Sequence, residues 1–474
     1  MESPADPDLF ARLAIGRLIA KKGVYLFDPF GFTPRKDLFV DHEWFSGYAF
    51  YLISLLRADW AFVVFRCVTM TVSIYLLYLA CLEWNKGKVN CFSFLFGVVQ
   101  CLYIWFSVVR SQVFTYMLIP LLLLGICRFE RRASASTLSL MPIAMLLWAN
   151  SHGGFVVGFA FLGLYVCILS IRRDFRRLIV VLSCIGACVI ATSINPYGFR
   201  LFWLFVIEAV SMPRPTISEW QPLSFFVAAD ILNFFYLGVI IIGLYIKRKN
   251  IEKIELLFLF VSSIEGIMHQ RLFAITAMIA IVFCQGYFEA TLSAFRNHFS
   301  SVYQSISRSS AFALLLLSIP LLLFSLFRLA TISSHRLDFS KYPVYALESL
   351  RQSKESGKLL VDFNLGSFAL WRLYPKFLVS LDGRYEEVYP ESTVKLVSES
   401  LCPSCENFLN SFQTVDPDFV VVSAKDEANK MLAKIGKAWS VAYMDEEFAI
   451  LSKKELSLIS RRDLGNIKMW EPLF

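Results

Sequence analysis

The sequence predicts a polytopic α-helical membrane protein that ends in a small α/β domain, and two observations carry this prediction. First, 57% of the 474 residues are hydrophobic and only 18% are charged, whereas soluble domains contain about half apolar and about a quarter charged residues. Second, the apolar residues gather in blocks of about 17–22, the length that crosses a hydrocarbon core of ~30 Å. These blocks stop near residue 331.

Ten apolar segments are predicted to cross the membrane, and two shorter ones to lie along its surface. Residues 44–57 and 199–211 are apolar but short, which favours interfacial helices. The predicted crossings are 60–82, 90–108, 112–127, 137–150, 155–171, 178–194, 226–246, 254–268, 271–288 and 311–330. We therefore expect three parts: an acidic extracytoplasmic loop at 1–43, a membrane domain at 44–330 and an α/β domain at 331–474.

Short runs of Lys and Arg set the predicted orientation, because such runs favour the cytoplasmic side of a membrane. These runs are NKGK at 85–88, RFERR at 128–132, RRDFRR at 172–177 and KRKNIEK at 247–253. The same rule explains the net charge of +8 without a nucleic-acid partner. An even number of crossings then places the N-terminal segment and the C-terminal domain on the extracytoplasmic side.

The C-terminal part shows strands alternating with helices. GKLLVDF, KFLVSLDGR, DFVVVSA and WSVAYMDEEFAILSKK have strand character, and SFALWRLY, STVKLVSESL and EANKMLAKI have helix character. This order predicts a small α/β domain with a mainly parallel sheet. Asp382, Arg384, Glu386 and Glu387 follow a predicted strand, where ligands bind in open sheets; a solvated turn held by an Asp–Arg pair explains this segment equally well. Cys402 and Cys405 would form a disulfide outside the cytoplasm.

Polar motifs fall at the predicted extracytoplasmic ends of the crossings, and ionisable groups near membrane depth usually mark function. Each motif alone also has a structural explanation: NPYG is a turn sequence, HGG lets helices approach closely, and an arginine can anchor an interface. The residues in these motifs are Asp41, His42, Glu43, Arg110, Gln112, Asn150, His152, Asn195, Glu219, His269 and Arg271.

The residue types on this face suit group transfer from a lipid phosphate carrier. No Ser-His-Asp or Cys-His arrangement and no zinc spacing is present in the sequence. A carboxylate can deprotonate an acceptor hydroxyl or hold a divalent cation. Arginine or histidine can neutralise a departing phosphate. We therefore expect a reaction centre at the outer membrane interface.

The order of the motifs resembles that of the GT-C glycosyltransferase superfamily. DPDLF, DHEW, RSQ, WANSHGGF, NPYG, SEWQP and LYPKFLVSLDGRYEEVY look like the series in bacterial relatives of the lipopolysaccharide-core sugar transferases and the dolichyl-phosphate-mannose protein mannosyltransferases. Relatives carry a transmembrane helix before the first acidic motif; here five residues precede Asp6. The resemblance implies a GT-C-like membrane domain in a bacterial inner membrane, with its active site facing the periplasm.

The implied activity is transfer of a sugar from a polyprenyl-phosphate donor to a glycolipid, polysaccharide or protein acceptor. By position in the motifs, Asp8 is the implied catalytic base, with Asp6 beside it and Glu43 as a second carboxylate. Asp8 and Glu43 are also the implied ligands of a divalent cation, Mg or Mn, if one is needed. The other residues of the outer motifs, together with Asp382 and Arg384, are the implied binding residues for the donor phosphate or the substrate.

Two other functions remain open from the residues. A non-catalytic GT-C-like scaffold for envelope polysaccharide assembly would keep the membrane domain without the chemistry. A lipid-linked glycan ligase or polymerase would take its glycan from a pyrophosphate carrier. A transporter is less well supported, because polar groups at the midplane and internal repeats are the features expected of it.

Overall fold

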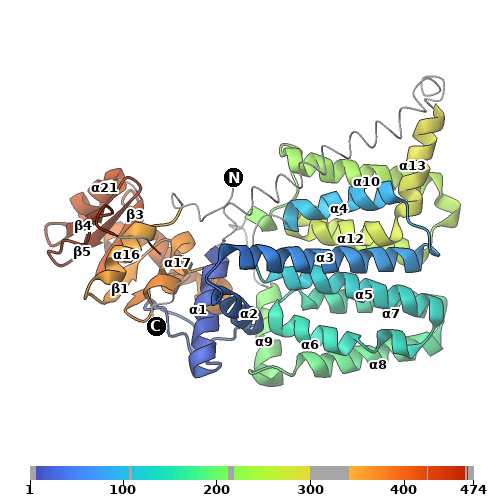
Figure 1. Cartoon of the computed structure of the whole chain (residues 1–474), viewed down its shortest axis with the longest axis horizontal. Helices are drawn as coiled ribbons and strands as arrows, with labels where there is room; N and C mark the ends of the chain where they lie inside the picture. The colour runs from blue at the N-terminus through green and yellow to red at the C-terminus, as the bar shows by residue number, and fades with distance from the viewer. Residues whose placement is uncertain are drawn as a thin grey trace.

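A computed structural model shows a bundle of long helices with an α/β unit at one end (Figure 1). The structure describes residues 7–105, 109–211, 218–298, 341–423, 425–464 and 467. Helices α1 and α2 lie at the junction between the bundle and the α/β unit (Figure 1). This junction is where the polar motifs meet.

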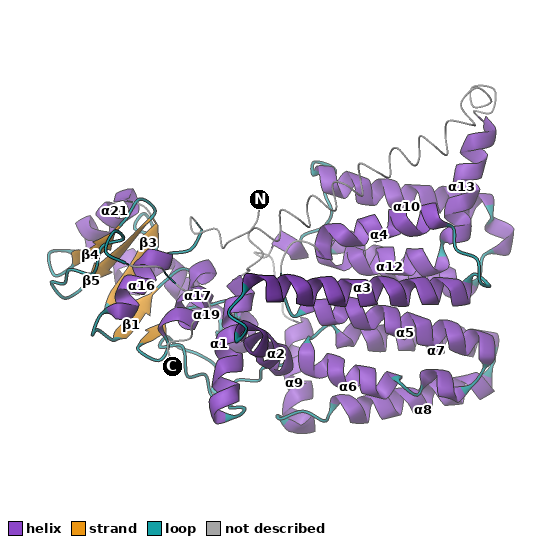
Figure 2. Cartoon of the chain, viewed as in Figure 1, coloured by secondary structure: helices purple, strands orange, loops and turns teal. Residues whose placement is uncertain are grey.

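The helices of the membrane part pack as neighbouring pairs, with α3 against α5, α6 against α8, α4 against α12 and α10 against α13 (Figure 2). Their bounds are α2 Trp44–Ser54, α3 Asp59–Trp84, α4 Cys91–Trp105, α5 Gln112–Arg132, α6 Met141–Ser151, α7 Phe155–Arg172, α8 Phe175–Thr192, α9 Gly198–Ser211, α10 Ala228–Ile246, α11 Lys253–Met268, α12 Phe273–Phe283 and α13 Gln285–His298. Short 3-10 turns cover Ala135–Leu138, Ser218–Trp220, Arg248–Asn250 and Gln270–Leu272.

Four of the described helices are long and apolar enough to cross a membrane, and α12 with α13 forms a fifth candidate that is bent by 78°. The four are Trp60–Trp84 within α3, α5, α7 and α8. The total of ten crossings stays a prediction, since the predicted crossing 311–330 lies outside the described residues. The predicted division of the chain at residue 331 lies there too.

The predicted crossing at 271–288 is not one straight helix, because it breaks at Cys284 into α12 and α13, a bent pair that stays a candidate for a single broken span. The break leaves backbone carbonyls of α12 without their usual partners. The Asn85 side chain donates a hydrogen bond to the Val282 carbonyl at 3.1 Å, and the Gln285 side chain accepts one from the Asn90 amide at 2.9 Å. A neighbouring loop thus satisfies polar groups that a bent helix exposes.

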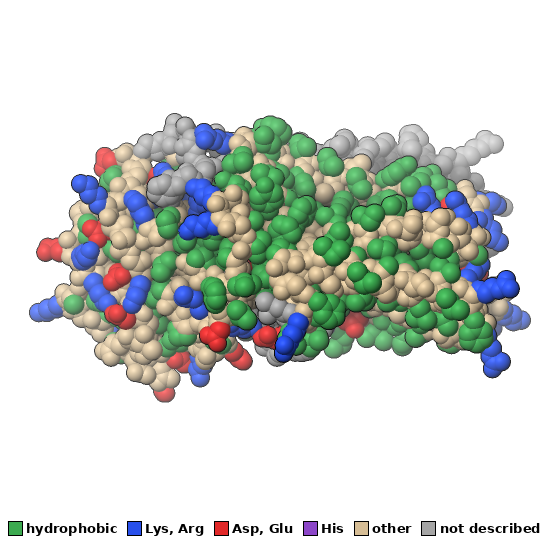
Figure 3. Space-filling model, turned by 90° about the horizontal axis from the view of Figure 1, so that it is seen from below, with side chains coloured by type: hydrophobic (Ala, Val, Ile, Leu, Met, Phe, Trp, Pro, Cys, Tyr) green, Lys and Arg blue, Asp and Glu red, His purple; other side chains and the backbone are tan. Residues whose placement is uncertain are grey.

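Hydrophobic side chains cover the outside of the bundle, while Lys and Arg gather at the end remote from the α/β unit (Figure 3). On α8, for example, Ile179, Leu182 and Ile190 are exposed. Large exposed apolar surfaces are unusual on soluble proteins and typical of lipid-facing ones. The chain therefore has the character of an integral membrane protein.

Within the N-terminal segment, whose place as an extracytoplasmic loop stays a prediction, residues Pro7–Lys22 form helix α1. Helix α1 is apolar on several sides and packs against α2 and α17, a helix of the α/β unit. Gly16 allows the crossing with α2, since a Cβ atom there would lie 2.1 Å from the Gly47 carbonyl oxygen. The Phe10 ring packs edge-on against Phe368 with a centroid separation of 4.8 Å.

The α/β unit has a five-stranded sheet of order β2-β1-β3-β5-β4. Strand β1 pairs in parallel with β2 and β3, whereas β5 pairs antiparallel with β3 and β4. The elements are α16 Val344–Gln352, β1 Gly357–Leu360, α17 Phe363–Leu373, β2 Phe377–Val379, α18 Tyr385–Val388, α19 Glu391–Ser400, α20 Phe408–Val415, β3 Phe419–Ser423, α21 Lys425–Ile435, β4 Ser440–Met444 and β5 Phe448–Ser452.

The expected mainly parallel sheet is correct only for its first half. Strands β4 and β5 are joined by the short turn 445–447, in which the Asp445 carboxylate accepts hydrogen bonds from the Glu447 and Phe448 amides. A connection this short forces the two strands to run antiparallel. Cys402 and Cys405 form a disulfide between α19 and α20.

Candidate functional site

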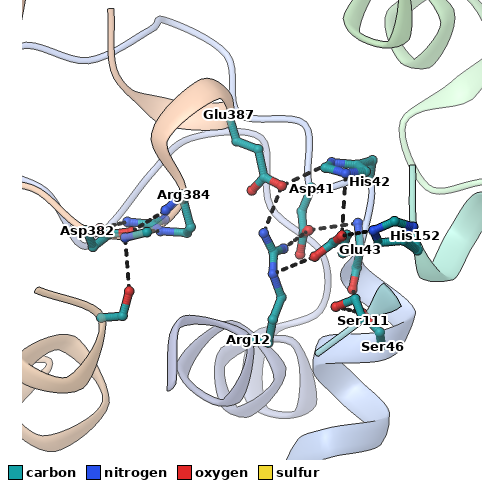
Figure 4. Close-up of polar contacts among 12 residues, drawn as sticks. Arg12, Asp41, His42, Glu43, Ser46, Ser111, His152, Asp382, Arg384 and Glu387 are labelled. Carbon is teal, nitrogen blue, oxygen red and sulfur yellow. Dashed lines mark hydrogen bonds and ion pairs between the residues drawn. The ribbon is translucent and has the colours of Figure 1, made fainter. Parts of the chain in front are cut away.

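Predicted residues of the N-terminal segment and of the end of α6 meet Arg12 of α1 and Glu387 of the α/β unit, and Figure 4 shows Asp41, His42, Glu43 and His152 around them. Two neighbouring sets can be distinguished. The inner cluster consists of Arg12, Asp41, His42, Glu43 and Glu387. The outer group is more exposed and consists of Asp8, Arg110, Gln112, Glu219 and Arg271.

Arg12 holds the inner cluster together from helix α1. Its guanidinium forms ion pairs with Asp41, with Glu43 at 2.9 Å and with Glu387 at 2.8 Å. Its side chain is only 8% exposed, and that of Asp41 is fully buried. Burial opposes the charged form of Arg12, but its three carboxylate partners raise its pKa well above the ordinary value. One cation thus neutralises carboxylates from the N-terminal segment and from the α/β unit.

His42 is the second cation of the inner cluster, with Nδ1 3.0 Å from Glu387 Oε1. Burial lowers the pKa of His42, yet its contact with Glu387 and the charge of Glu43 outweigh burial and raise the pKa to about 9. Burial raises the pKa of Glu43, but Arg12 and the histidines bring it down to about 2. Burial dominates at Asp41 and raises its pKa to about 6. Glu43 is therefore ionised at neutral pH and a weak base.

His152 has the opposite protonation state. Its Nδ1 accepts a hydrogen bond from the Gly154 amide at 2.9 Å and lies 2.8 Å from Thr115 Oγ1. The Trp148 indole donates to Thr115 Oγ1 at 2.7 Å, which leaves the Thr115 hydroxyl proton for His152. Burial lowers the pKa of His152 to about 3. His152 is therefore neutral with its proton on Nε2, which faces Glu43 Oε1 at 3.6 Å.

The WANSHGG motif builds this arrangement. Asn150 accepts a hydrogen bond from the Trp44 indole at 2.7 Å and donates to the Ile194 carbonyl at 3.0 Å, so it joins three segments. A Cβ atom at Gly153 would lie 3.2 Å from His42 Nε2, and one at Gly154 would lie 2.3 Å from Thr115 Oγ1. Both glycines therefore make room for polar side chains, in addition to letting two helices approach closely.

The outer group places a half-exposed carboxylate beside an arginine. Asp8 Oδ2 lies 3.7 Å from Arg110 Nε, and Arg110 also pairs with Glu219 at 2.5 Å. The Asp8 side chain is 49% exposed. A Cβ atom at Gly383 would lie 2.9 Å from Asp8 Oδ1, so the α/β unit leaves room for this carboxylate. Asp8 thus stands at the surface where the two parts of the chain meet.

Arg271 joins the outer group from the turn before α12. The Gln112 side chain, in the amide orientation that satisfies both residues, accepts a hydrogen bond from Arg271 Nε at 2.9 Å. The Arg271 guanidinium also lies 5.0 Å from the centre of the Trp220 ring. His269 Nδ1 is 3.0 Å from the Trp220 carbonyl oxygen, so it holds this turn. The SEWQP and HQR motifs therefore lie together, as their shared predicted side requires.

Three other predicted residues make contacts that hold the fold, and one of them, Asn195, follows Ile194, whose carbonyl binds Asn150. Asp382 and Arg384 are fully buried and pair with each other at 2.6 Å, and Arg384 also pairs with Asp28 at 2.6 Å. The Asp–Arg pair that we gave as the alternative explanation of these residues is therefore present. It lies in the protein core and not in a solvated turn. Asn195 accepts a hydrogen bond from the Tyr197 amide at 2.9 Å, which builds the NPYG turn. Asp6 lies outside the described residues.

Sequence reasoning missed Arg12, and it did not connect Glu387, which stands in the predicted LDGRYEEVY segment, with the N-terminal motifs. Arg12 lies in the apolar stretch LFARLAIG, where a buried arginine needs a carboxylate partner, and this is the signal that could have identified it. Glu387 stands 375 positions away from Arg12, so no local pattern connects them.

No group of three or more His, Cys, Asp or Glu side chains in the described part of the chain is placed to hold a metal ion. Arg12 already engages Asp41 and Glu43, so this arrangement does not fit a divalent cation. The cation expected at Asp8 and Glu43 stays a prediction, and no step below depends on it.

No protein-family model and no curated protein sequence matches the chain. Its structure, however, is similar to membrane proteins with the GT-C type of fold. One is the Archaeoglobus fulgidus oligosaccharyltransferase in its apo form, with a TM-score of 0.55, 13% identity, and 89% of this chain and 66% of that chain covered. Another is the oligosaccharyltransferase AglB of the same organism in complex with an inhibitory peptide and a dolichol-phosphate, with a TM-score of 0.52, 12% identity and the same coverage.

At this level of identity the similarity shows the fold. The chain spans slightly less than two thirds of the length of the archaeal proteins, at 66%. The GT-C part of the predicted resemblance is thereby confirmed as a fold.

Proposed function

We propose that the chain is an integral membrane glycosyltransferase that transfers a sugar from a polyprenyl-phosphate donor to an extracytoplasmic acceptor. The observation that carries this proposal is the half-exposed carboxylate of Asp8 beside Arg110, at one end of a bundle with an oligosaccharyltransferase fold. One of the similar structures contains a dolichol-phosphate and a peptide, which supports a lipid-linked donor and a peptide or protein among the acceptors.

Asp8 is the best-placed catalytic base among the predicted carboxylates that the structure describes. Asp41 is fully buried, and Glu43 is 13% exposed and paired with Arg12. Both are engaged by Arg12 in the inner cluster. Asp8 is 49% exposed and lies 3.7 Å from Arg110. In the proposed step, Asp8 takes the proton of the acceptor as the acceptor attacks the anomeric carbon of the donor sugar.

Arg110 and Arg271 are proposed to bind the donor phosphate. As the new glycosidic bond forms, the bond between the anomeric carbon and the phosphate oxygen breaks, and the phosphate leaves with the bonding electrons. A guanidinium can form paired charge-assisted hydrogen bonds with such a group. Both arginines are partly exposed and lie on the same face as Asp8. Arg110 contacts Asp8 directly. Arg271 bonds to Gln112, which follows Arg110 by two residues.

The proposed orientation puts this site outside the cytoplasm of a bacterial inner membrane. The end of the bundle remote from the site carries the Lys and Arg side chains (Figure 3), which the positive-inside rule assigns to the cytoplasm. The disulfide between Cys402 and Cys405 lies in the α/β unit, and disulfides persist mainly in oxidising compartments. As part of the same proposal, the chain is related to the lipopolysaccharide-core sugar transferases or to the protein mannosyltransferases.

The test is a transfer assay in membranes that contain the full chain. Radiolabelled polyprenyl-phosphate mannose, glucose, galactose and N-acetylglucosamine are supplied one at a time, and label in glycolipid, polysaccharide and protein is measured. Wild type should transfer at least one sugar, and Asp8→Asn should lose transfer by about 100-fold or more, the scale of a lost general base. Asp37→Asn is the matched control, because Asp37 is an exposed carboxylate in the same N-terminal segment.

Other outcomes would point to other functions. Transfer that survives in Asp8→Asn would contradict the assignment of the base. Transfer only from pyrophosphate-linked glycans would favour a ligase or polymerase. A well-folded wild type that transfers from no donor would favour the scaffold. Loss of transfer on adding a metal chelator, with recovery on adding Mg or Mn, would support the predicted cation.

A further inference from the structure

Glu43, whose carboxylate also accepts a hydrogen bond from the Ser111 side chain, has its Oε1 near two imidazole nitrogens. This oxygen is 3.6 Å from His152 Nε2 and 3.7 Å from His42 Nε2. Both distances exceed the range of an N–H to oxygen hydrogen bond. The side chains of Glu43, His42 and His152 are each 13–15% exposed. Polar atoms at such separations are typically bridged by a third group.

Glu43 and His152 have different hydrogen-bonding roles toward a bound group. Glu43 is anchored by Arg12, which binds its other oxygen at 2.9 Å, so Oε1 is an ionised acceptor. His152 accepts hydrogen bonds at Nδ1 from the Gly154 amide and from Thr115, so its Nε2 must be a donor. A group that lies beside both has to donate to Glu43 and accept from His152, and the protonated His42, with Nε2 3.7 Å from the same oxygen, is a further donor. A hydroxyl does both, whereas a phosphate oxygen can only accept and would be repelled by Glu43.

We propose that His152 and Glu43 bind one hydroxyl of the donor sugar, and that Thr115 is a positioning residue that keeps the His152 Nε2–H directed at it. This inference rests on the proposed function and assigns it a sugar-recognition site. It differs from the role expected from the sequence, in which His152 was to orient the acceptor or the donor phosphate. Glu43 holds the hydroxyl without deprotonating it, because its charge is already shared with Arg12.

The donor sugar is favoured over the acceptor because of what lies next to His152. Arg271, one of the proposed phosphate ligands, bonds to Gln112, which lies one turn before Thr115 on α5, and Thr115 contacts His152. A donor whose phosphate is bound by Arg271 therefore carries its sugar toward the pair of His152 and Glu43.

The test uses monodeoxy donors. Purified full-length protein in detergent is given the radiolabelled polyprenyl-phosphate sugar that wild type transfers, and its 2-, 3-, 4- and 6-deoxy analogues. Binding is measured by filter retention and transfer by kcat/KM. One deoxy analogue should be about 10- to 100-fold weaker with wild type, the effect of a lost hydrogen bond to a charged group. In His152→Ala this penalty should shrink, because only Glu43 still binds the hydroxyl, while those of the other analogues stay unchanged.

Thr115 provides the second comparison, which does not depend on whether His152→Ala folds. Thr115→Val should reduce the penalty for the same analogue, and Thr115→Ser should restore it, since serine keeps the hydroxyl. Thr71→Val is the matched control, because the Thr71 hydroxyl is exposed on α3 and bonds only to the Cys67 carbonyl of its own helix; it should keep the full penalty. A merely structural role of Thr115 would weaken all analogues equally.

The outcomes separate the two proposals. A wild type that binds and transfers the parent sugar but treats all deoxy analogues alike overturns the hydroxyl site and leaves the glycosyltransferase proposal standing. The same is true if the penalty is equal in wild type, His152→Ala and Thr115→Val. A wild type that transfers none of the four parent sugars overturns the proposed function, and the hydroxyl site falls with it.

Discussion

Replacing Arg12 by methionine should destabilise the junction between the N-terminal segment and the α/β unit. Methionine keeps the length and the apolar contacts but removes the charge. Asp41, Glu43 and Glu387 would then share His42 as their remaining charged partner within the inner cluster, while their side chains are 0%, 13% and 3% exposed. Removing one partner of a buried ion pair costs about 3–5 kcal/mol. We expect the Tm of the purified protein to fall by about 5 °C or more.

The pH dependence identifies the cause of this loss. In Arg12→Met, the carboxylates lose the charge that keeps the pKa of Glu43 at about 2, so their folded pKa values rise toward or above their unfolded ones. A carboxyl group whose pKa is higher in the folded than in the unfolded protein binds more protons when the protein is folded. The free energy of unfolding of the protein therefore falls as the pH rises. The difference in Tm between Arg12→Met and wild type should therefore be larger at pH 8 than at pH 5.

The control is Arg176→Met, which removes an exposed arginine from α8 and should change Tm by less than about 1 °C, as surface substitutions do. The reasoning would be refuted if Arg12→Met and Arg176→Met had the same Tm at pH 8. A loss of stability in Arg12→Met that does not vary with pH would show that packing rather than charge is responsible.

Three further predictions concern single side chains and are measured by thermal unfolding in detergent. The pKa of His42 in the folded protein, about 9, exceeds its ordinary value of 6.5. The charged His42 therefore contributes about 3 kcal/mol to the free energy of unfolding, in full below pH 6.5, and this contribution is lost as the pH rises through 9. The Tm of wild type should fall over this pH range and that of His42→Asn should not; parallel curves would contradict the ion pair. Arg384→Met leaves Asp28 buried without its cation and should cost about 3–5 kcal/mol; an unchanged Tm would mean that the pair is neutral to folding. Gly16→Ala puts a methyl group 2.1 Å from the Gly47 carbonyl and should cost about 1–3 kcal/mol, whereas no change in Tm would show that α1 and α2 separate easily.

The sequence predicted the helices whose apolar blocks are long, because length and hydropathy alone identify them. It did not predict helix α1, since residues 7–22 are buried on several sides and show no single apolar stripe. It also missed the break at Cys284, because the groups that satisfy the bent helix come from Asn85 and Asn90, nearly 200 positions away. Local sequence patterns therefore predicted where helices form, whereas long-range polar contacts determine where these helices end.

The site divides in the same way. The WANSHGG motif predicted a polar centre, and its two glycines indeed make room for His42 and Thr115. The roles of the residues could not be read from the motif, because they depend on partners elsewhere. His152 is neutral through Thr115 and Gly154, while His42 is charged through Glu387. Two histidines in similar motifs thus receive opposite protonation states from the tertiary structure.

The α/β unit contributes to the site rather than standing apart from it. Glu387 of α18 pairs with Arg12 and His42, and Gly383 lies against Asp8. If the unit moved away, Arg12 would lose a buried carboxylate and the pKa of His42 would fall toward its ordinary value, because Glu387 is the main group that raises it. Docking of the α/β unit and the charge state of the inner cluster are therefore coupled, and each stabilises the other.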